Sequence, residues 1–373
     1  MIKVLEIIGK RPQGGIGSFI TNYQSHFTCD DVKLDYLIFN DESDGPFDRK
    51  VRNMGSEIYV LPELKNIRLF SIWKEINEFF NKHAGEYDVV HLHSANIAFM
   101  VFPAAKKVGI KNLLIHSHAT TYSDKKLNSI RNFFLYGAAR KYASHYLACS
   151  VAAGDFLYGK KKRNQVTVFN NAIECDEFTF HEDVRDNYRR QLGFLENQLV
   201  IGHVGRFCKQ KNQEYIIDVF KEICNIRDDV WLIFVGDGPL RQAVEERAKK
   251  LGVNNQILFL GQRNDVQNLM MAMDIFVLPS LYEGLPVVGV EAQALGLKCF
   301  FSESITREIE LSDATFLSIK QEPKAWAMEI CKTGTNDSKK REEAVATVRL
   351  KGYDISLEAS KLANFYNDLA SNG

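Results

Sequence analysis

The sequence lacks the cysteine pattern of a disulfide-stabilised or zinc-binding protein. Its seven cysteines are scattered, none forms a Cys-x-x-Cys pair, and their number is odd. This usage predicts reduced thiols and a cytoplasmic protein.

Two further absences narrow the class of protein. Lysine and arginine together number 47, and aspartate and glutamate also number 47. The chain therefore lacks the excess of positive charge that is typical of a nucleic-acid-binding protein. No apolar run has the length of a membrane-spanning helix. The opening residues 1–9 predict a first strand instead of a signal peptide. At 373 residues of ordinary hydrophobic content, the chain predicts a soluble globular protein of two domains.

Two motifs with defined chemistry are also missing. No Asp-x-Asp stands where it would hold a metal-bound diphosphate, since Asp228-Asp229 reads as a turn before a strand. No full Gly-x-Gly-x-x-Gly follows the first strand, which disfavours a Rossmann dinucleotide loop. We therefore expect neither a metal nor a cofactor.

The apolar pattern predicts an α/β protein. Thirteen short apolar runs, from residues 4–8 to residues 315–319, alternate with helix-patterned segments. This alternation is typical of parallel sheets covered on both faces, and the number of runs exceeds one comfortable sheet. Two doubly wound domains are expected, with a break around residues 174–183.

Residues 282–291 place two carboxylates around a predicted helix start. Glu283 fits a loop, Pro286 fits the first helical position, and Glu291 then falls two turns along the helix. Backbone amides from Leu285 to Val287 would bind an anion at the helix N-terminus. Carboxylates for hydroxyls beside amides for phosphate predict a nucleotide-sugar site. The alternative is a surface acid beside an ordinary helix.

A basic loop precedes this motif in the chain. Residues 205–212 follow a predicted buried strand, 199–204, and precede a predicted amphipathic helix, 214–226. Arg206 and Lys211 thus lie in a strand-to-helix loop, where open α/β sheets bind ligands. Arg206 can fork onto phosphate oxygens, and Lys211 adds a mobile charge. A solvated basic loop is the alternative, since Lys209 lies there too.

Together these segments resemble the C-terminal half of the retaining glycosyltransferases of family 4, which have the GT-B fold. The polysaccharide-assembly branch is the nearest likeness, and the N-terminal half matches more loosely. The motifs that carry the resemblance are Gly205 to Asn212, Gly236 to Pro239, Gly261 to Asp265 and Glu283 to Glu291.

The resemblance implies two doubly wound Rossmann-like domains that face each other across a cleft. Residues 355–369 have helical apolar spacing, and in this fold the last helix crosses back to the N-terminal domain. The implied domains are 1–178 with 355–373, which binds the acceptor, and 179–354, which binds the nucleotide sugar.

The resemblance also implies roles for the site residues. Arg206 and Lys211 would stabilise the leaving diphosphate, Glu283 would contact hydroxyls of the donor sugar, and Glu291 would bind the ribose. Arg263 and nearby backbone would frame the nucleobase.

A glycine-rich loop at residues 14–18 follows the first strand. Such a loop lets backbone approach a phosphate, and Ser18 is expected to cap the next helix. Family 4 enzymes carry a glycine-rich loop here that touches the donor diphosphate and the acceptor, and Gly15 is the residue that matches best.

Two histidine pairs, His91 with His93 and His116 with His118, are spaced to share one side of a strand. Zinc binding is the alternative, but neither pair has an obvious third ligand at metal spacing. The family pattern favours a donor-side histidine near the reacting sugar. His118 fits that position and His116 is the second choice. Such a histidine would donate hydrogen bonds to sugar hydroxyls or stabilise developing charge.

Residues 127–146 combine a strongly apolar stretch with basic side chains. A helix that meets anionic lipid and a core-facing helix with ordinary surface charges both fit this pattern. The resemblance favours the first, because lipid-linked acceptors lie at the cytoplasmic leaflet.

The sequence thus predicts a retaining, metal-independent transferase of a hexose or N-acetylhexosamine from a UDP-sugar, with GDP left open. The acceptor would be a glycan, lipid-linked, in bacterial surface polysaccharide (capsule or exopolysaccharide) biosynthesis, with peripheral contact at the inner face of the cytoplasmic membrane. The alternatives are a UDP-N-acetylglucosamine 2-epimerase-like isomerase, a non-catalytic scaffold of a polysaccharide assembly complex and, more distantly, a Rossmann oxidoreductase.

Overall fold

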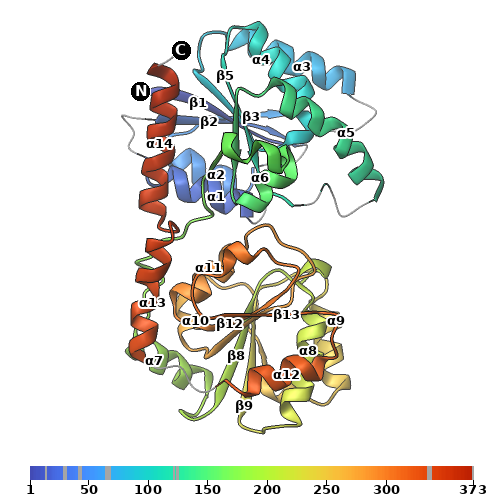
Figure 1. Ribbon diagram of the computed structural model, residues 1–373, viewed down its shortest axis with the longest axis vertical. Coiled ribbons are helices and arrows are strands. Elements are labelled where there is room, and N and C mark those ends of the chain that lie inside the picture. The colour runs from blue at the N-terminus through green and yellow to red at the C-terminus, as the bar shows by residue number, and fades with distance from the viewer. Residues whose placement is uncertain are drawn as a thin grey trace. The chain divides into compact units, whose positions relative to one another are not determined.

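The computed structural model describes residues 1–12, 15–27, 32–40, 44–63, 69–120, 122, 126–333 and 338–371. The chain folds into two compact units (Figure 1), Met1–Ala172 with Ile355–Gly373, and Ile173–Asp354. Residues 173–178, which the sequence assigned to the first domain, fall in the second unit. Their buried side chains, such as Phe178, pack in its core.

The first unit is built on one parallel sheet. In chain order its strands are β1 (Ile2–Ile8), β2 (Val32–Phe39), β3 (Ile58–Leu61), β4 (Val89–Leu92), β5 (Asn112–Ser117), β6 (His145–Ala148) and β7 (Val166–Val168). Across the sheet the order is β3-β2-β1-β4-β5-β6-β7. The winding direction reverses between β1 and β4, and open α/β sheets bind ligands at such a switch point.

Helices connect these strands. They are α1 (Gly15–Gln24), α2 (Pro46–Asn53), α3 (Leu69–Lys82), α4 (Ala98–Lys107), α5 (Lys126–Tyr142), α6 (Val151–Tyr158) and the C-terminal α14 (Ile355–Ser371). The predicted capping role of Ser18 is wrong, because α1 already begins at Gly15 and Ser18 lies inside its first turn. Gly14 lies outside the described residues.

The C-terminal helix α14 belongs to the first unit, as the resemblance implied. It packs against α1, β1 and β2 (Figure 1). Leu362 and Tyr366 are buried there in the same core as Val4 and Phe19. The helix therefore completes one face of the sheet.

The second unit repeats the architecture with a sheet of order β10-β9-β8-β11-β12-β13. Its strands are β8 (Leu199–Val204), β9 (Val230–Val235), β10 (Ile257–Phe259), β11 (Ile275–Leu278), β12 (Lys298–Ser302) and β13 (Ala314–Leu317). Its helices are α7 (Glu182–Leu192), α8 (Gln213–Cys224), α9 (Arg241–Lys250), α10 (Val266–Met271), α11 (Val287–Ala294), α12 (Pro323–Cys331) and α13 (Ser338–Leu350). The winding direction reverses between β8 and β11.

Both sheets are buried on their two faces by apolar side chains, which explains the continuous apolar runs in the strands. The predicted α/β class and the strand positions are confirmed. In the described part of the chain, no helix has both the length and the apolar character needed to cross a membrane. The described cysteines are free thiols.

Candidate functional site

The second unit joins two predicted site residues at its switch point. Lys211 lies in the loop after β8, and Glu283 lies in the loop after β11. Nζ of Lys211 is 2.7 Å from Oε1 of Glu283. Because these two strands are neighbours and parallel, their carboxyl ends bring the loops together. The basic and acidic motifs therefore form one site.

Gln210 ties the two loops more closely. Its Nε2 donates to Oε2 of Glu283 at 3.1 Å and to the carbonyl of Tyr282 at 3.0 Å. Its own carbonyl accepts from the backbone amide of Leu281 at 2.8 Å. The sequence pattern did not single out Gln210, although this residue lies inside the basic motif. Glu283 is thus held from both oxygens before any ligand binds.

Glu291 lies on α11, near the charge of Lys211. Burial raises the pKa of Glu291 to about 7, and the positive charge of Lys211 opposes this rise. The helix begins at Val287 with Pro286 as its N-cap, so Pro286 is not the first helical residue. Glu291 consequently lies just over one turn along the helix, and the predicted two turns are wrong.

The N-terminus of α11 offers fewer amides than the sequence suggested. Of Leu285, Pro286 and Val287, the proline has no N–H and cannot donate. Val287 and Val288 occupy the first turn, where an amide has no carbonyl partner inside the helix. These amides are the anion-binding donors that the helix can offer.

Arg206 has an exposed side chain, and its backbone is fixed by a buried network. Nε2 of Gln213 donates to the carbonyl of Arg206 at 2.9 Å and lies 3.2 Å from Nε2 of His203. Nδ1 of His203 is 2.9 Å from the carbonyl of Val277. Burial lowers the pKa of His203 to about 3, so the ring is neutral and its Nδ1 carries the proton toward that carbonyl. The sequence analysis missed this support, which links β8, β11 and α8.

Two glycines let neighbouring loops pack against the Arg206 loop. A Cβ on Gly236 would lie 2.2 Å from the carbonyl oxygen of Gly205, and the φ of Gly236 is +128°. A Cβ on Gly238 would lie 2.4 Å from the carbonyl oxygen of Phe207. The glycines of the 236–239 motif are therefore required by backbone approach.

Arg263 pairs with Asp265, a different carboxylate from the one that Lys211 contacts. It follows β10 at the sheet edge and forms two hydrogen bonds to Asp265, at 2.8 and 2.7 Å. Tyr188 donates to the same carboxylate at 2.9 Å. A role beside the nucleobase stays a prediction. In that role the Arg263 guanidinium would have to contact the base while it keeps its hydrogen bonds to Asp265, or break those hydrogen bonds.

The first unit gathers all four predicted histidines at its own switch point. His91 and His116 are buried, whereas His118 is partly exposed just beyond β5. Nε2 of His91 is 3.1 Å from Nδ1 of His116, and Nδ1 of His93 is 2.7 Å from Nε2 of His118. The two pairs are therefore one cluster, a contact that the spacing within each pair did not indicate.

The unexpected partner is Glu6, a buried acid in the middle of β1. Its Oε1 and Oε2 lie 3.2 Å from His91 Nδ1 and 2.5 Å from His93 Nε2. Ligand atoms of His91, His93 and His116 lie within 4.8 Å of one another and could hold a metal ion. The prediction that no metal is needed stays a prediction.

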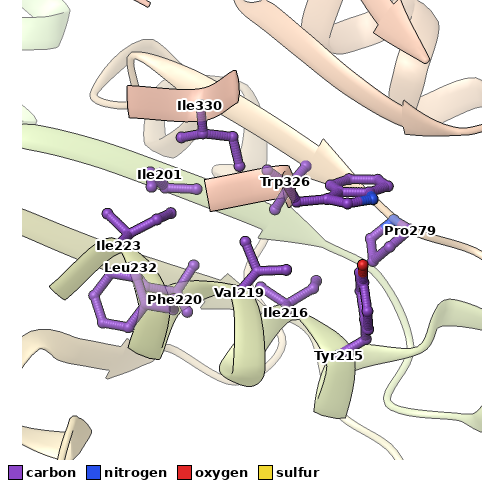
Figure 2. A pocket seen from close by; sticks show the side chains of 11 residues that line it. Ile201, Tyr215, Ile216, Val219, Phe220, Ile223, Leu232, Pro279, Trp326 and Ile330 are labelled. Carbon is purple, nitrogen blue, oxygen red and sulfur yellow. The ribbon is translucent and has the colours of Figure 1, made fainter. Parts of the chain in front are cut away.

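An apolar pocket lies between α8 and α12 in the second unit (Figure 2). Its lining includes Phe220, Trp326 and Ile330, and the phenol of Tyr215 is already hydrogen-bonded to the carbonyl of Gln321 at 3.0 Å. Such a lining offers little to fix a phosphate or a sugar. We regard it as a packing gap in the core.

Comparison with known proteins agrees with this arrangement. The family model described as Glycosyl transferases group 1 matches residues 184–349, and the model described as Glycosyltransferase Family 4 matches residues 13–177. A protein of Bacillus subtilis (strain 168) named as the glycosyltransferase EpsF is 29% identical over 98% of this chain and 96% of its own length. The UDP-Gal:alpha-D-GlcNAc-diphosphoundecaprenol alpha-1,3-galactosyltransferase of Escherichia coli is 28% identical over 65% of each chain.

Solved structures share the two-sheet architecture. HepE of Anabaena in complex with UDP-glucose superimposes with a TM-score of 0.77 over 99% of this chain and 100% of that chain, at 19% identity. WaaG, a glycosyltransferase involved in lipopolysaccharide biosynthesis, gives a TM-score of 0.69 over 97% and 99%, at 18% identity. At these identities the likeness shows the fold, and the predicted GT-B class is confirmed.

Proposed function

Because the chain belongs to the group 1 glycosyltransferases of glycosyltransferase family 4, we propose that it transfers a hexose or N-acetylhexosamine from a UDP-sugar with retention of configuration. The proposed acceptor is a lipid-linked glycan in the assembly of a bacterial surface polysaccharide. No metal is required in this proposal, because cationic side chains and helix amides serve the diphosphate.

The observation that carries the proposal is the grouping of Lys211, Glu283 and Glu291 at one switch point. A cation beside two carboxylates matches a ligand that carries both phosphate and hydroxyl groups. Lys211 would bind a phosphate oxygen, Glu283 a hydroxyl of the sugar, and Glu291 the ribose hydroxyls. The first-turn amides of α11 add donors for the diphosphate.

The chemistry follows from these placements. The bond between the anomeric carbon and the diphosphate oxygen breaks, and negative charge grows on the diphosphate. Arg206 and Lys211 stabilise that charge. The acceptor hydroxyl attacks the anomeric carbon from the face that the diphosphate leaves, and its proton passes to a diphosphate oxygen. No protein base is needed in this scheme.

The choice of a uridine nucleotide and a lipid-linked acceptor is supported by relatives. The name of the Escherichia coli relative includes both a UDP-sugar and a diphosphoundecaprenol acceptor. We extend both features to this chain as part of the proposal.

A surface of α5 supports contact with the cytoplasmic face of a membrane. Ile130, Phe133 and Phe134 follow helical spacing, and their side chains are 61%, 52% and 72% exposed. Exposed Arg131 and Lys141 lie on the same helix. Exposed apolar side chains with adjacent cations fit an interface with anionic lipid. We place the enzyme in the cytoplasm at that membrane.

The proposal is tested by calorimetry and thermal shift with UDP, GDP, ADP, NAD and several UDP-sugars, each with and without EDTA. A ligand that binds only the folded state raises the melting temperature. We expect a UDP-specific shift that EDTA does not change and that one UDP-sugar enlarges. A shift with NAD would favour the oxidoreductase alternative, and no shift with any nucleotide would favour the scaffold. Conversion of UDP-N-acetylglucosamine without an acceptor would favour the isomerase.

A further inference from the structure

The histidine cluster of the first unit contains a chain of hydrogen bonds that ends at a partly exposed ring. Oε2 of Glu6 lies 2.5 Å from Nε2 of His93. Nδ1 of His93 lies 2.7 Å from Nε2 of His118. His118 follows β5 at the carboxyl edge of the sheet, where ligands bind in this class of fold.

The positions of the protons in this series of hydrogen bonds, from Glu6 through His93 to His118, follow from the chemistry of the three groups. Burial alone would raise the pKa of Glu6, but its interactions with His91 and His93 outweigh it and hold the pKa well below its usual range. An ionised carboxylate only accepts, so Nε2 of His93 carries the proton between them. Burial lowers the pKa of His93, so that ring is neutral and its Nδ1 has a lone pair.

It follows that His118 is the donor in its contact with His93. The proton lies on Nε2 of His118 and points inward. Burial, with the neighbouring His93 and His91, lowers the pKa of His118 well below its usual range, so the ring is neutral. Its Nδ1 then has a lone pair, and no described residue hydrogen-bonds to that atom.

The orientation of the ring is fixed by packing. His116 stacks on His118 with centroids 4.2 Å apart, and Phe19 of α1 meets the ring edge-on at 5.2 Å. Glu6 is itself fixed, because Tyr366 of α14 donates to its Oε1 at 3.0 Å. The same phenol lies 2.6 Å from Nδ1 of His91.

We propose that Glu6 and His93 are positioning residues that hold His118 as its Nε2–H tautomer, so that Nδ1 accepts a hydrogen bond from a sugar hydroxyl. His118 then accepts from the sugar and does not donate to it. The inference rests on the proposed function for the identity of the hydroxyl, whereas the tautomer itself does not.

Hydrogen bonding explains this cluster better than metal binding. Both ring nitrogens of His91 and of His93 already have partners in the protein. Of the three histidines that could hold an ion, the nitrogen without a partner among the described residues is Nε2 of His116. A metal would have to displace the bonds to Glu6 or His118.

The decisive measurement is a two-bond ¹H–¹⁵N correlation spectrum of the full chain with ¹⁵N-labelled histidine at pH 7. The His118→Gln variant assigns the His118 signals by their loss. We expect the His118 signals to be those of a neutral ring that is protonated at Nε2. A proton on Nδ1, or on both nitrogens, would overturn the proposal. Metal analysis and titration with zinc accompany the spectrum, and stoichiometric zinc bound by His91, His93 and His116 would overturn it as well.

A substitution tests the link from Glu6 to His118. The Glu6→Gln variant removes the carboxylate that fixes the proton of His93, so signals of the Nδ1–H form of His118 should appear. If transfer is observed, kcat should fall about tenfold or more while KM for the donor changes less. Tyr158→Phe is the control, because it removes a buried polar group of the same unit whose hydrogen bonds go to the carbonyls of Ile115 and Leu147 instead of to the histidines.

The two readouts separate the tautomer from the proposed function. An unchanged His118 spectrum in Glu6→Gln would contradict the positioning role, whatever the activity. If the spectra are as expected but the enzyme transfers no sugar, the assigned tautomer of His118 is supported and the proposed function is contradicted.

Discussion

Nζ of Lys211 lies 2.7 Å from Oε1 of Glu283, and this ion pair joins the loops of two neighbouring strands. The cation proposed for the diphosphate and the carboxylate proposed for the sugar therefore neutralise each other when no donor is bound. Donor binding must exchange this pair for contacts with phosphate and hydroxyl groups. Substitution of Lys211 should then affect the contacts with phosphate, whereas substitution of Glu283 should affect the contacts with the sugar.

Lys211→Ala should lower transferase activity by about tenfold to a hundredfold, because it removes a cation that stabilises the leaving diphosphate. Arg206→Ala should do the same. Both side chains are at least partly exposed, so the fold should stay intact. Steady-state kinetics and melting temperatures provide the test.

The matched control for these variants is Lys209→Ala, which removes an exposed lysine from the same loop. It should leave activity within about twofold of the unmodified enzyme. Equal losses in all three variants would indicate only a general effect of positive charge. Unchanged turnover in both Arg206→Ala and Lys211→Ala would contradict the phosphate assignment.

Glu283→Gln should impair turnover and largely spare UDP binding. The amide keeps the shape of the side chain but removes the charge that binds the sugar hydroxyl and pairs with Lys211. Calorimetry with UDP, compared with kinetics on the UDP-sugar, distinguishes the two effects. If UDP affinity falls as far as turnover, Glu283 acts on the nucleotide and the proposed role is wrong.

The raised pKa of Glu291, about 7, predicts pH-dependent donor binding. Ionised Glu291 accepts hydrogen bonds from ribose more strongly than the protonated form. The affinity for a UDP-sugar should therefore rise between pH 6 and pH 8. A UDP-sugar is the better probe, because a terminal phosphate titrates near pH 6 itself. Glu291→Gln should bind more weakly, with little dependence on pH.

The same pKa has a consequence for stability. Between the ordinary pKa of 4.5 and about 7, the folded protein holds a proton on Glu291 that the unfolded chain has released. The free energy of unfolding should therefore fall as pH rises through this window. Because the side chain is only partly buried, we expect about 1–2 kcal/mol. Denaturant titrations of the enzyme and of Glu291→Gln at pH 5 and pH 8 measure it.

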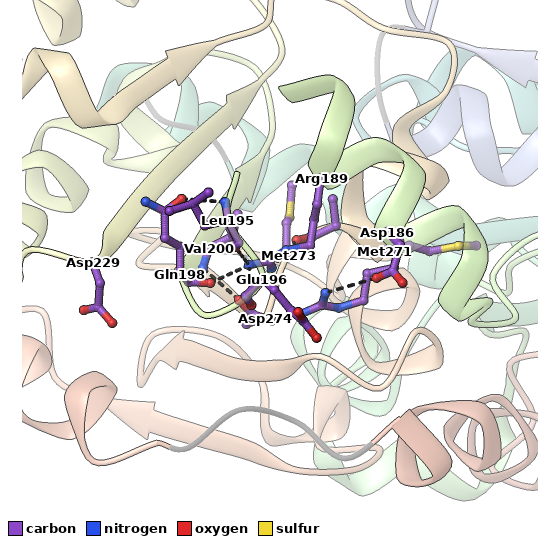
Figure 3. A network of polar contacts seen from close by, with 12 residues as sticks. Asp186, Arg189, Leu195, Glu196, Gln198, Val200, Asp229, Met271, Met273 and Asp274 are labelled. Atoms are coloured by element: carbon purple, nitrogen blue, oxygen red, sulfur yellow. Dashed lines mark hydrogen bonds and ion pairs between the residues drawn. The ribbon is translucent and has the colours of Figure 1, made fainter. Parts of the chain in front are cut away.

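A buried network of hydrogen bonds and ion pairs surrounds Asp274 in the second unit (Figure 3). Its carboxylate accepts from Arg185 at 2.6 Å, Arg189 at 3.1 Å and the backbone amide of Val200 at 2.8 Å. Arg189 also donates to the carbonyl of Ala272 at 3.1 Å. Asp274→Asn leaves a buried guanidinium without its counter-charge and should cost about 3–5 kcal/mol.

Asp186→Asn is the control for this network. Asp186 is exposed and lies 3.9 Å from Arg185, so its removal should cost about 0.5 kcal/mol or less. Denaturant unfolding at one pH compares the two variants. Similar losses would show that the buried network contributes no more than a surface ion pair.

The fold could be predicted because each helix and strand has a pattern of apolar residues within its own short stretch of sequence. Each buried strand is an apolar run, and the helix 355–369 has its own apolar spacing. The neighbour relations are not local, since β1 pairs with β4 across more than eighty residues of sequence. Glu6 therefore looked like one acid in an apolar run, and its histidine partners could not be inferred. An acid in the middle of a buried strand was nevertheless a usable signal.

The proximity of two candidate site residues could be predicted where a motif supplied both chemistry and position. Lys211 and Glu283 come from motifs on adjacent strands, and the structure brings them together. The start of α11 was misplaced by one residue, because proline is common at the first helical position whereas Pro286 is the N-cap here. The ion pair of Arg263 with Asp265 and the support of Gln210 depend on side-chain contacts that spacing does not encode.

The exposed apolar side chains of α5 predict reversible membrane binding. Phe133 and Phe134 should enter the headgroup region, while Arg131 meets anionic lipid. Each buried aromatic ring contributes about 1.5–3 kcal/mol. The double variant Phe133→Ser, Phe134→Ser should therefore weaken binding to vesicles that contain anionic phospholipid by at least about tenfold. Flotation of the full chain with such vesicles measures the bound fraction.

Leu350→Ser provides the matched control, because Leu350 is an exposed apolar side chain of α13 in the other unit. It should bind vesicles like the unmodified enzyme. The double variant should keep its melting temperature, because both rings are exposed and leave no cavity when removed. Its activity on a water-soluble acceptor should also be unchanged, whereas transfer to a lipid-linked acceptor in vesicles should fall. Equal flotation of all three proteins would remove α5 as a membrane contact and would leave the donor-site assignments untouched.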